Sequence, residues 1–134
     1  RLLGHPGIGP TVTGLALAAS DNFSARYDLD RIKGVFSRPT HKLFGESYVD
    51  RILVLNAAKG GVATAWMLKE MRERGIAPMA LLLNFANPIM AQAAAFADMP
   101  LIDRFEPDIT TAVRTGDRLE IVPETGAVRV LEVA

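Results

Sequence analysis

The stretch 51–83 constrains the fold more than any other part of the chain, because it reads as a strand, a turn, a helix and a second strand in succession. Residues 51–56 form an apolar run of strand length, and a glycine turn at 57–61 follows. Thr64, Met67, Leu68 and Met71 then recur with helical spacing, and Gly75 ends that helix. The next apolar run, 78–83, lies at a distance that fits a right-handed crossover between parallel strands. The sequence therefore predicts a β-α-β unit.

Weaker patterns flank this unit. We expect strands at 11–18 and 100–102, an extended piece at 23–28, a helix from Pro88 to Ala97 and an antiparallel hairpin of 117–122 with 127–133. Residues 30–47 show no clear period and predict a long excursion with short strands at most. Residues 1–10 are rich in Gly and Pro, which predicts a flexible N-terminal segment or linker before a domain at 11–134. The fold class is thus α/β, a mixed sheet or partial barrel with helices on one side.

Composition excludes several classes of function. The chain has 134 residues, enough for one domain, and its 15 basic residues balance 15 acidic ones without forming blocks, so we expect no binding to nucleic acid. There is no apolar run of membrane-spanning length and no signal-peptide pattern, which predicts a cytoplasmic protein that does not contact a membrane. Cysteine is absent, so the usual ligands of an iron–sulfur cluster are missing. His5 and His41 lie too far apart in the sequence for a zinc motif, and we expect no metal site in this chain.

The segment 59–64 is the most informative candidate site. A glycine turn that leads from a buried strand into a helix leaves backbone N–H groups free at the positive end of the helix dipole. Gly60 and Gly61 permit close approach of a ligand, Val62 completes the turn, and Lys59 adds a positive charge suited to a carboxylate or a phosphate. The segment is not a Walker loop. It predicts an anion-binding loop, with a plain strand-to-helix connection as the alternative.

Other candidates each have two interpretations. His41 could act as an acid or base, or it could cap a turn. Arg26 and Asp28 could face a polar ligand or form an exposed ion pair. Trp66, with the methionines of the same helix, is expected in the core rather than against a cofactor. No Ser-His-Asp or Cys-His set is present, so the chain alone offers a binding loop without catalytic machinery.

The order of these segments resembles the small subunit of the aconitase X family, or the equivalent domain of its single-chain members. The resemblance covers about Gly9 to Val133, and its strongest support is the strand 51–55 with Lys59-Gly60-Gly61, followed by 75–80. The other supporting segments, in chain order, are 12–17, 23–28, 41–47, 87–90, 99–102 and 115–119.

The resemblance implies a swivelling β/β/α domain that closes over a large component carrying an iron–sulfur cluster, in a heterodimer or within one polypeptide. The activity implied is that of a hydro-lyase, the dehydration of a small anionic hydroxy acid. We expect cis-3-hydroxy-L-proline or a related acid as substrate, with phosphomevalonate as the alternative. We expect the substrate-binding residues to be Lys59, Gly60, Gly61, Val62, Arg26 and His41.

The chain departs from the family pattern at the expected catalytic base. The resemblance implies a serine in the glycine loop, but Gly61, Val62 and Ala63 stand there, and the first hydroxyl is that of Thr64. The base could therefore be Thr64, Lys59 or a group of the large component. A non-catalytic binding or regulatory module that kept the fold is the rival hypothesis. A mobile carrier domain fits less well, because neither histidine begins a helix after a glycine loop.

Overall fold

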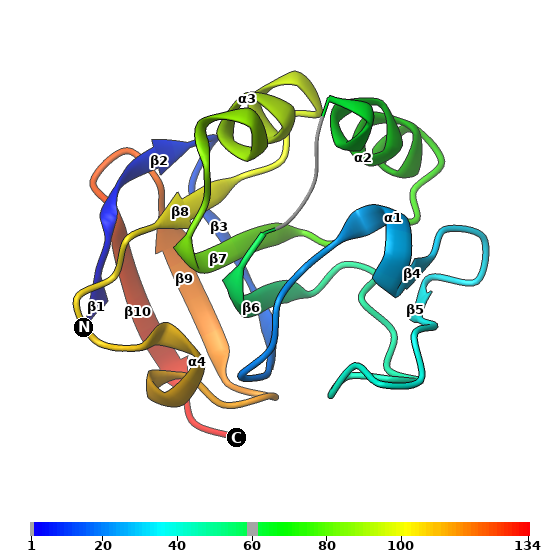
Figure 1. The fold of residues 1–134 in the computed structure, drawn as a ribbon. Helices are drawn as coiled ribbons and strands as arrows, with labels where there is room; N and C mark the ends of the chain where they lie inside the picture. The colour runs from blue at the N-terminus through cyan, green and yellow to red at the C-terminus, as the bar shows by residue number, and fades with distance from the viewer. Residues whose placement is uncertain (1, 59–61) are drawn as a thin grey trace.

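The fold is built around one mixed eight-stranded sheet. The computed structural model describes residues 2–58 and 62–134 (Figure 1). The strand order is β1-β10-β9-β3-β6-β7-β8-β2. The strands are, in chain order, β1 (Leu2–Leu3), β2 (His5–Ile8), β3 (Val12–Ala18), β6 (Ile52–Ala57), β7 (Ala80–Phe85), β8 (Leu101–Asp103), β9 (Arg118–Val122) and β10 (Ala127–Glu132). Strands β3, β6, β7 and β8 are parallel neighbours, and β9 and β10 form the antiparallel hairpin. The predicted β-α-β unit, mixed sheet and hairpin are confirmed.

The N-terminal residues close this sheet into a barrel. Strands β1 and β2 stand at opposite ends of the strand order, yet only Gly4 separates them along the chain. The N–H of Gly4 donates to the carbonyl of Gly126 at 2.7 Å, and that of Gly7 donates to Pro123 at 2.7 Å, while β2 pairs with β8 (Figure 1). A loop or linker at 1–10 was therefore the wrong prediction for the described residues 2–8. Gly4 and Gly7 are required for close approach between strands, and Pro6 lies where the pairing of β2 with β8 is irregular, between His5 and Ile8.

Alternate residues of the central strands contribute to two separate cores. Leu53 and Leu55 of β6 pack in the core beneath the helices, whereas Ile52 and Val54 pack in the barrel interior. The first core is covered by α1 (Ala25–Asp28), α2 (Ala63–Glu73) and α3 (Pro88–Phe96). A single turn, α4 (Ile109–Ala112), inserts Ile109 into the second core. No described helix combines the length and the apolar character that a bilayer crossing requires.

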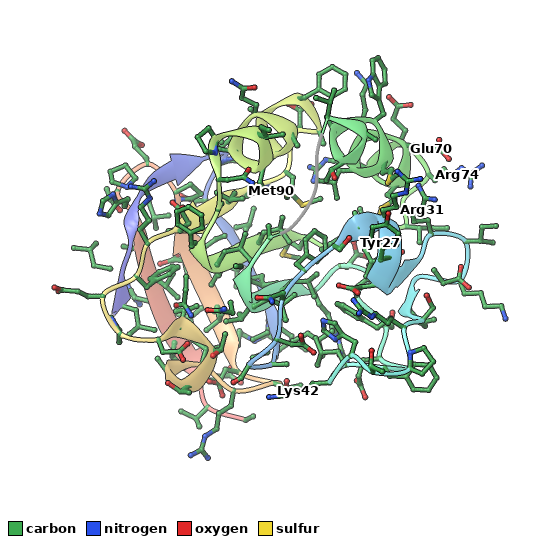
Figure 2. All side chains as sticks on the ribbon, in the orientation of Figure 1. Tyr27, Arg31, Lys42, Glu70, Arg74 and Met90 are labelled. Atoms are coloured by element: carbon green, nitrogen blue, oxygen red, sulfur yellow. The ribbon has the colours of Figure 1, made fainter. Side chains whose placement is uncertain are left out.

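The excursion predicted at 30–47 forms a small lobe beside the sheet. It holds the two-stranded pair β4 (Leu29–Asp30) and β5 (Val35–Phe36), as expected of a region with short strands at most. The preceding piece 23–28 was predicted to be extended, but Ser24 caps a helical turn there by accepting a hydrogen bond from the N–H of Tyr27. This turn, α1, packs against α2, where Glu70 and Arg74 form an ion pair at 3.6 Å (Figure 2).

Trp66 lies on the surface, contrary to the prediction that it packs in the core. The side of α2 that faces the sheet carries Thr64, Leu68 and Met71, and this places Trp66 on the opposite side, 64% exposed. Its ring contacts that of Phe96 of α3 edge-to-face, with the ring centroids 4.9 Å apart. The sequence pattern located the helix correctly but assigned its aromatic residue to the wrong face.

Candidate functional site

The candidate site lies where the parallel strands β3, β6 and β7 end. Ligands of parallel α/β sheets and barrels bind at the carboxyl ends of the strands, because the segments that follow the strands converge there. The segment after β3 reaches across to the end of β6, where the N–H of Phe23 donates to the carbonyl of Ala57 at 2.8 Å and Phe23 pairs with Ala58. The predicted anion-binding loop follows Ala58 directly in the chain.

The predicted loop residues are only partly described. Lys59, Gly60 and Gly61 lie outside the described residues. Val62 precedes the first turn of α2, is 74% exposed and provides no side-chain cap for the helix. Thr64 is 3% exposed and belongs to the side of α2 that faces the sheet. Its hydroxyl therefore lies at the edge of the core and not on the open surface.

A polar cavity of about 220 Å³ adjoins this edge. Its central group is the carboxylate of Asp28, which is 2% exposed. One oxygen accepts from the backbone N–H of Ser24 at 2.9 Å, and the other accepts from Arg38 Nη1 at 3.3 Å. The guanidinium of Arg38 also donates through Nε to Thr40 Oγ1 at 3.1 Å. The cavity is lined by Asp21, Asn22, Phe23, Ser24, Asp28, Arg38, Thr40 and His41.

The His41 ring is held in one orientation by hydrogen bonds at both nitrogens. The N–H of Leu43 donates to Nδ1 at 3.0 Å, which places the ring proton on Nε2. Nε2 then donates to the carbonyl oxygen of Asn22 at 2.7 Å, and the ring stacks on Phe36 with the centroids 4.7 Å apart. Both nitrogens are therefore occupied, which favours the turn-stabilising interpretation of His41 over the acid–base one.

Arg26 does not join this cluster. Its side chain lies over the ring of Tyr27, with the guanidinium carbon 5.5 Å from the centroid. Asp28, its expected partner, binds Arg38 instead. The sequence missed Arg38 and Ser24 as lining residues, because each is brought to the cavity by a segment without regular periodicity.

A row of hydrogen-bonded side chains crosses the ends of the three parallel strands, and its members are Asn22, Asn56, Asn84 and Asp108. Asn84 Nδ2 donates to Asp108 Oδ1 at 2.8 Å and to Asn56 Oδ1 at 3.0 Å. Asn56 Nδ2 donates in turn to Asn22 Oδ1 at 3.2 Å. A second cavity of about 330 Å³ lies beside this chain, lined by Ser20, Asp21, Asn22, Asn56, Asp108 and Thr110. This row was not predicted from the sequence, although Asn56 and Asn84 are each the polar residue that follows an apolar strand core.

Two carboxylates that line this second cavity, those of Asp21 and Asp108, are held in the ionised form. Hydrogen bonds from the Thr110 hydroxyl and from Asn84 lower the pKa of Asp108 below its ordinary value. Burial alone would raise the pKa of Asp21, but the backbone N–H groups of Lys42 and Asn22 outweigh it, and the net pKa is lowered. Both side chains therefore act as hydrogen-bond acceptors at neutral pH.

Acid should weaken the fold partly through Asp108. A carboxyl with a depressed pKa in the folded state stabilises the fold above its unfolded value, near 3.8, and this contribution is lost as the pH falls through the folded-state value. We expect Asp108→Asn to lose less stability than the wild type between pH 7 and pH 3 in urea unfolding. Asp98→Asn, at an exposed turn, is the matched control. An identical pH dependence in wild type and Asp108→Asn would contradict this account.

Comparisons with known proteins agree with the fold and with the sequence resemblance. A family model described as the aconitase X swivel domain matches residues 1–130. The phosphomevalonate dehydratase small subunit of Methanopyrus kandleri is 33% identical over 107 residues, covering 80% of this chain and 79% of that protein. The protein of the same name from Thermococcus sibiricus is 30% identical over 132 residues, covering 98% and 99%.

A solved structure agrees at the level of the fold. The crystal structure of Thermococcus kodakaraensis aconitase X in its holo-form superposes with a TM-score of 0.89, covering 98% of each chain at 23% identity. At that identity the likeness shows the fold alone, and it confirms the predicted α/β class with a mixed sheet and partial barrel.

Proposed function

The chain belongs to the aconitase X swivel-domain family, and on that premise we propose that it is the small, swivelling component of a hydro-lyase that dehydrates a small hydroxylated carboxylate. The observation that carries the proposal is the family match over residues 1–130, together with relatives that are named as small subunits of a dehydratase. The polar edge at the ends of β3, β6 and β7 is where this chain would contribute to the substrate site.

The iron–sulfur cluster implied by the family does not fit the residues of this chain. The sequence contains no cysteine, and the described residues contain no group of three or more His, Cys, Asp or Glu side chains placed to hold a metal ion. We therefore place the cluster on a large partner component. The role of this chain would be to bind and orient the substrate and to shield it from water.

The substrate proposed first is phosphomevalonate. The two relatives named above carry this activity in their names, whereas cis-3-hydroxy-L-proline rests on the sequence resemblance alone. Phosphomevalonate carries a carboxylate and a phosphate, and the loop with Lys59 would bind one of these anionic groups. Thr64 faces the sheet, which supports Lys59 ahead of Thr64 as the group of this loop that meets the substrate. The catalytic base would then be Lys59 or a group of the large component.

The assay that tests this proposal compares the two substrates directly. The chain is mixed anaerobically with its large component, and dehydration of phosphomevalonate and of cis-3-hydroxy-L-proline is followed side by side. We expect turnover of phosphomevalonate. Turnover of cis-3-hydroxy-L-proline alone would refute phosphomevalonate as the substrate, but it would still support a hydro-lyase activity. A stable complex that dehydrates neither acid would favour the rival hypothesis of a binding or regulatory module, which the absent loop serine supports.

A further inference from the structure

The hydrogen bonds of the row at the strand ends fix which way each amide presents its oxygen and its NH₂ group. An ionised carboxylate can only accept hydrogen bonds, so Asp108 requires the NH₂ group of Asn84 to point toward it. The N–H of Ile109 donates to Asn84 Oδ1 at 2.8 Å and reinforces the same orientation. The second hydrogen of Asn84 Nδ2 then requires Asn56 to present its oxygen.

The orientation of the Asn84 amide also determines the orientations of the Asn56 and Asn22 amides. Because Asn56 presents its oxygen to Asn84, its NH₂ group is turned toward Asn22 and donates to Asn22 Oδ1. The Nδ2 group of Asn22 is therefore turned away from the row. Within residues 2–58 and 62–134, no hydrogen-bond partner is found for this group, although Asn22 lines both polar cavities.

The residue next to Asn22, Asp21, offers a hydrogen-bond acceptor where Asn22 offers a donor. The carboxylate of Asp21 lines the same two cavities, and its side chain is 28% exposed. Its oxygens accept from the backbone N–H groups of Asn22 and Lys42 and each retains a further lone pair. The backbone at this point is also fixed, since His41 Nε2 holds the carbonyl of Asn22 and the N–H of Asn56 donates to the carbonyl of Asp21 at 2.8 Å.

We propose that Asp21 and Asn22 form a hydroxyl-recognition pair, in which the Asp21 carboxylate accepts from a substrate hydroxyl and the Asn22 amide donates to the same oxygen. A hydroxyl is the group that both donates and accepts one hydrogen bond at a single atom, whereas in the second cavity a carboxylate or a phosphate would be repelled by the charges of Asp21 and Asp108. The inference rests on the proposed function for the class of its substrate, a hydroxy acid. It assigns the hydroxyl to this edge and leaves the anionic groups to the loop that carries Lys59.

The test compares a ligand that carries the hydroxyl with one that lacks it. The KM for phosphomevalonate, and the inhibition constant of the analogue in which hydrogen replaces its hydroxyl, are measured on the complex with the large component, in the wild type and in Asn22→Leu. We expect the wild type to prefer the hydroxylated ligand and Asn22→Leu to lose about tenfold of that preference, as for one hydrogen bond to a fixed donor. The affinity for the analogue should be nearly the same in the wild type and in Asn22→Leu, because the analogue has no hydroxyl to form hydrogen bonds with Asp21 and Asn22.

Two further variants make the outcome specific. Asn22→Asp keeps the acceptor for Asn56 but removes the donor, so it should lose the preference without disturbing the row. Gln92→Leu, an exposed amide replaced on α3, is the matched control and should keep the wild-type preference. A preference for the hydroxyl that persists in both Asn22 variants would overturn the pair and leave the proposed function standing. Failure of the wild type to bind either ligand would instead overturn the substrate class, and the pair with it.

Discussion

Gly7→Ala is expected to destabilise the protein by about 3 kcal/mol, the upper range for forcing an extra methyl group into a closely packed position. A Cβ atom at position 7 would overlap the carbonyl oxygen of Leu101, so β2 would have to move away from β8. That movement would also break the hydrogen bond from Gly7 to Pro123 and open the barrel at its closing strand. Thermal unfolding should show a midpoint lowered by about 10 °C.

His5→Ala provides the control for this prediction. His5 is exposed on the same strand, and exposed substitutions typically change stability by less than about 0.5 kcal/mol. If Gly7→Ala were as stable as His5→Ala, the N-terminal residues would not close the barrel in solution, and the description of 2–8 as part of the folded domain would be wrong.

Lys59→Ala is expected to lower kcat/KM of the assembled complex about a hundredfold for an anionic substrate. A hydrogen bond between a charged donor and a charged acceptor contributes about 1.5–3 kcal/mol, which corresponds to roughly ten- to a hundredfold or more in rate. The variant should still bind the large component, because the substitution removes a single charge from the chain. Steady-state kinetics combined with analytical gel filtration would measure both properties.

Lys33→Ala is the matched control for the loss of a positive charge. Lys33 is exposed in the turn between β4 and β5, away from the ends of the parallel strands. We expect its kcat/KM to remain within about twofold of the wild type. Equal activity of the Lys59→Ala and Lys33→Ala complexes would remove the loop from the substrate site, whatever the identity of the substrate.

The parts of the fold that the sequence predicts are those determined by local patterns. The β-α-β unit at 51–83 is recognisable because apolar runs and helical spacing alternate over short distances, and Gly75, at φ 72°, ends α2 in the left-handed conformation that glycine favours. The N-terminal strands were missed for the opposite reason. Glycine and proline indicate loops locally, but here Gly4 and Gly7 serve contacts with segments about a hundred residues away.

The residues of the candidate site were predicted in part, and their role stays a prediction. The anion-binding loop predicted at 59–61 lies outside the described residues and rests on its glycines, which interrupt a strand-to-helix pattern in the sequence. The row of Asn22, Asn56, Asn84 and Asp108 joins residues from four separate segments, and only the parallel register of β3, β6 and β7 brings them together. A polar residue at the end of each apolar strand was the signal that could have indicated it.

The cavity around Asp28 was missed for a different reason. Its cation, Arg38, lies ten residues away in a segment without periodicity, and the pairing of Asp28 with Arg26 was the simpler local choice. Side-chain partners of a buried carboxylate are set by the path of the backbone, which the sequence does not show for such a segment.

The measurement that tests the central claim most directly is a titration of this chain into a fixed amount of the large component under anaerobic conditions, with dehydration of phosphomevalonate as the readout. The account predicts no turnover by either component alone and a rate that rises with added chain to a plateau once the large component is saturated. Full activity of the large component by itself, unchanged by the addition of this chain, would contradict the claim that the chain is a required part of the hydro-lyase.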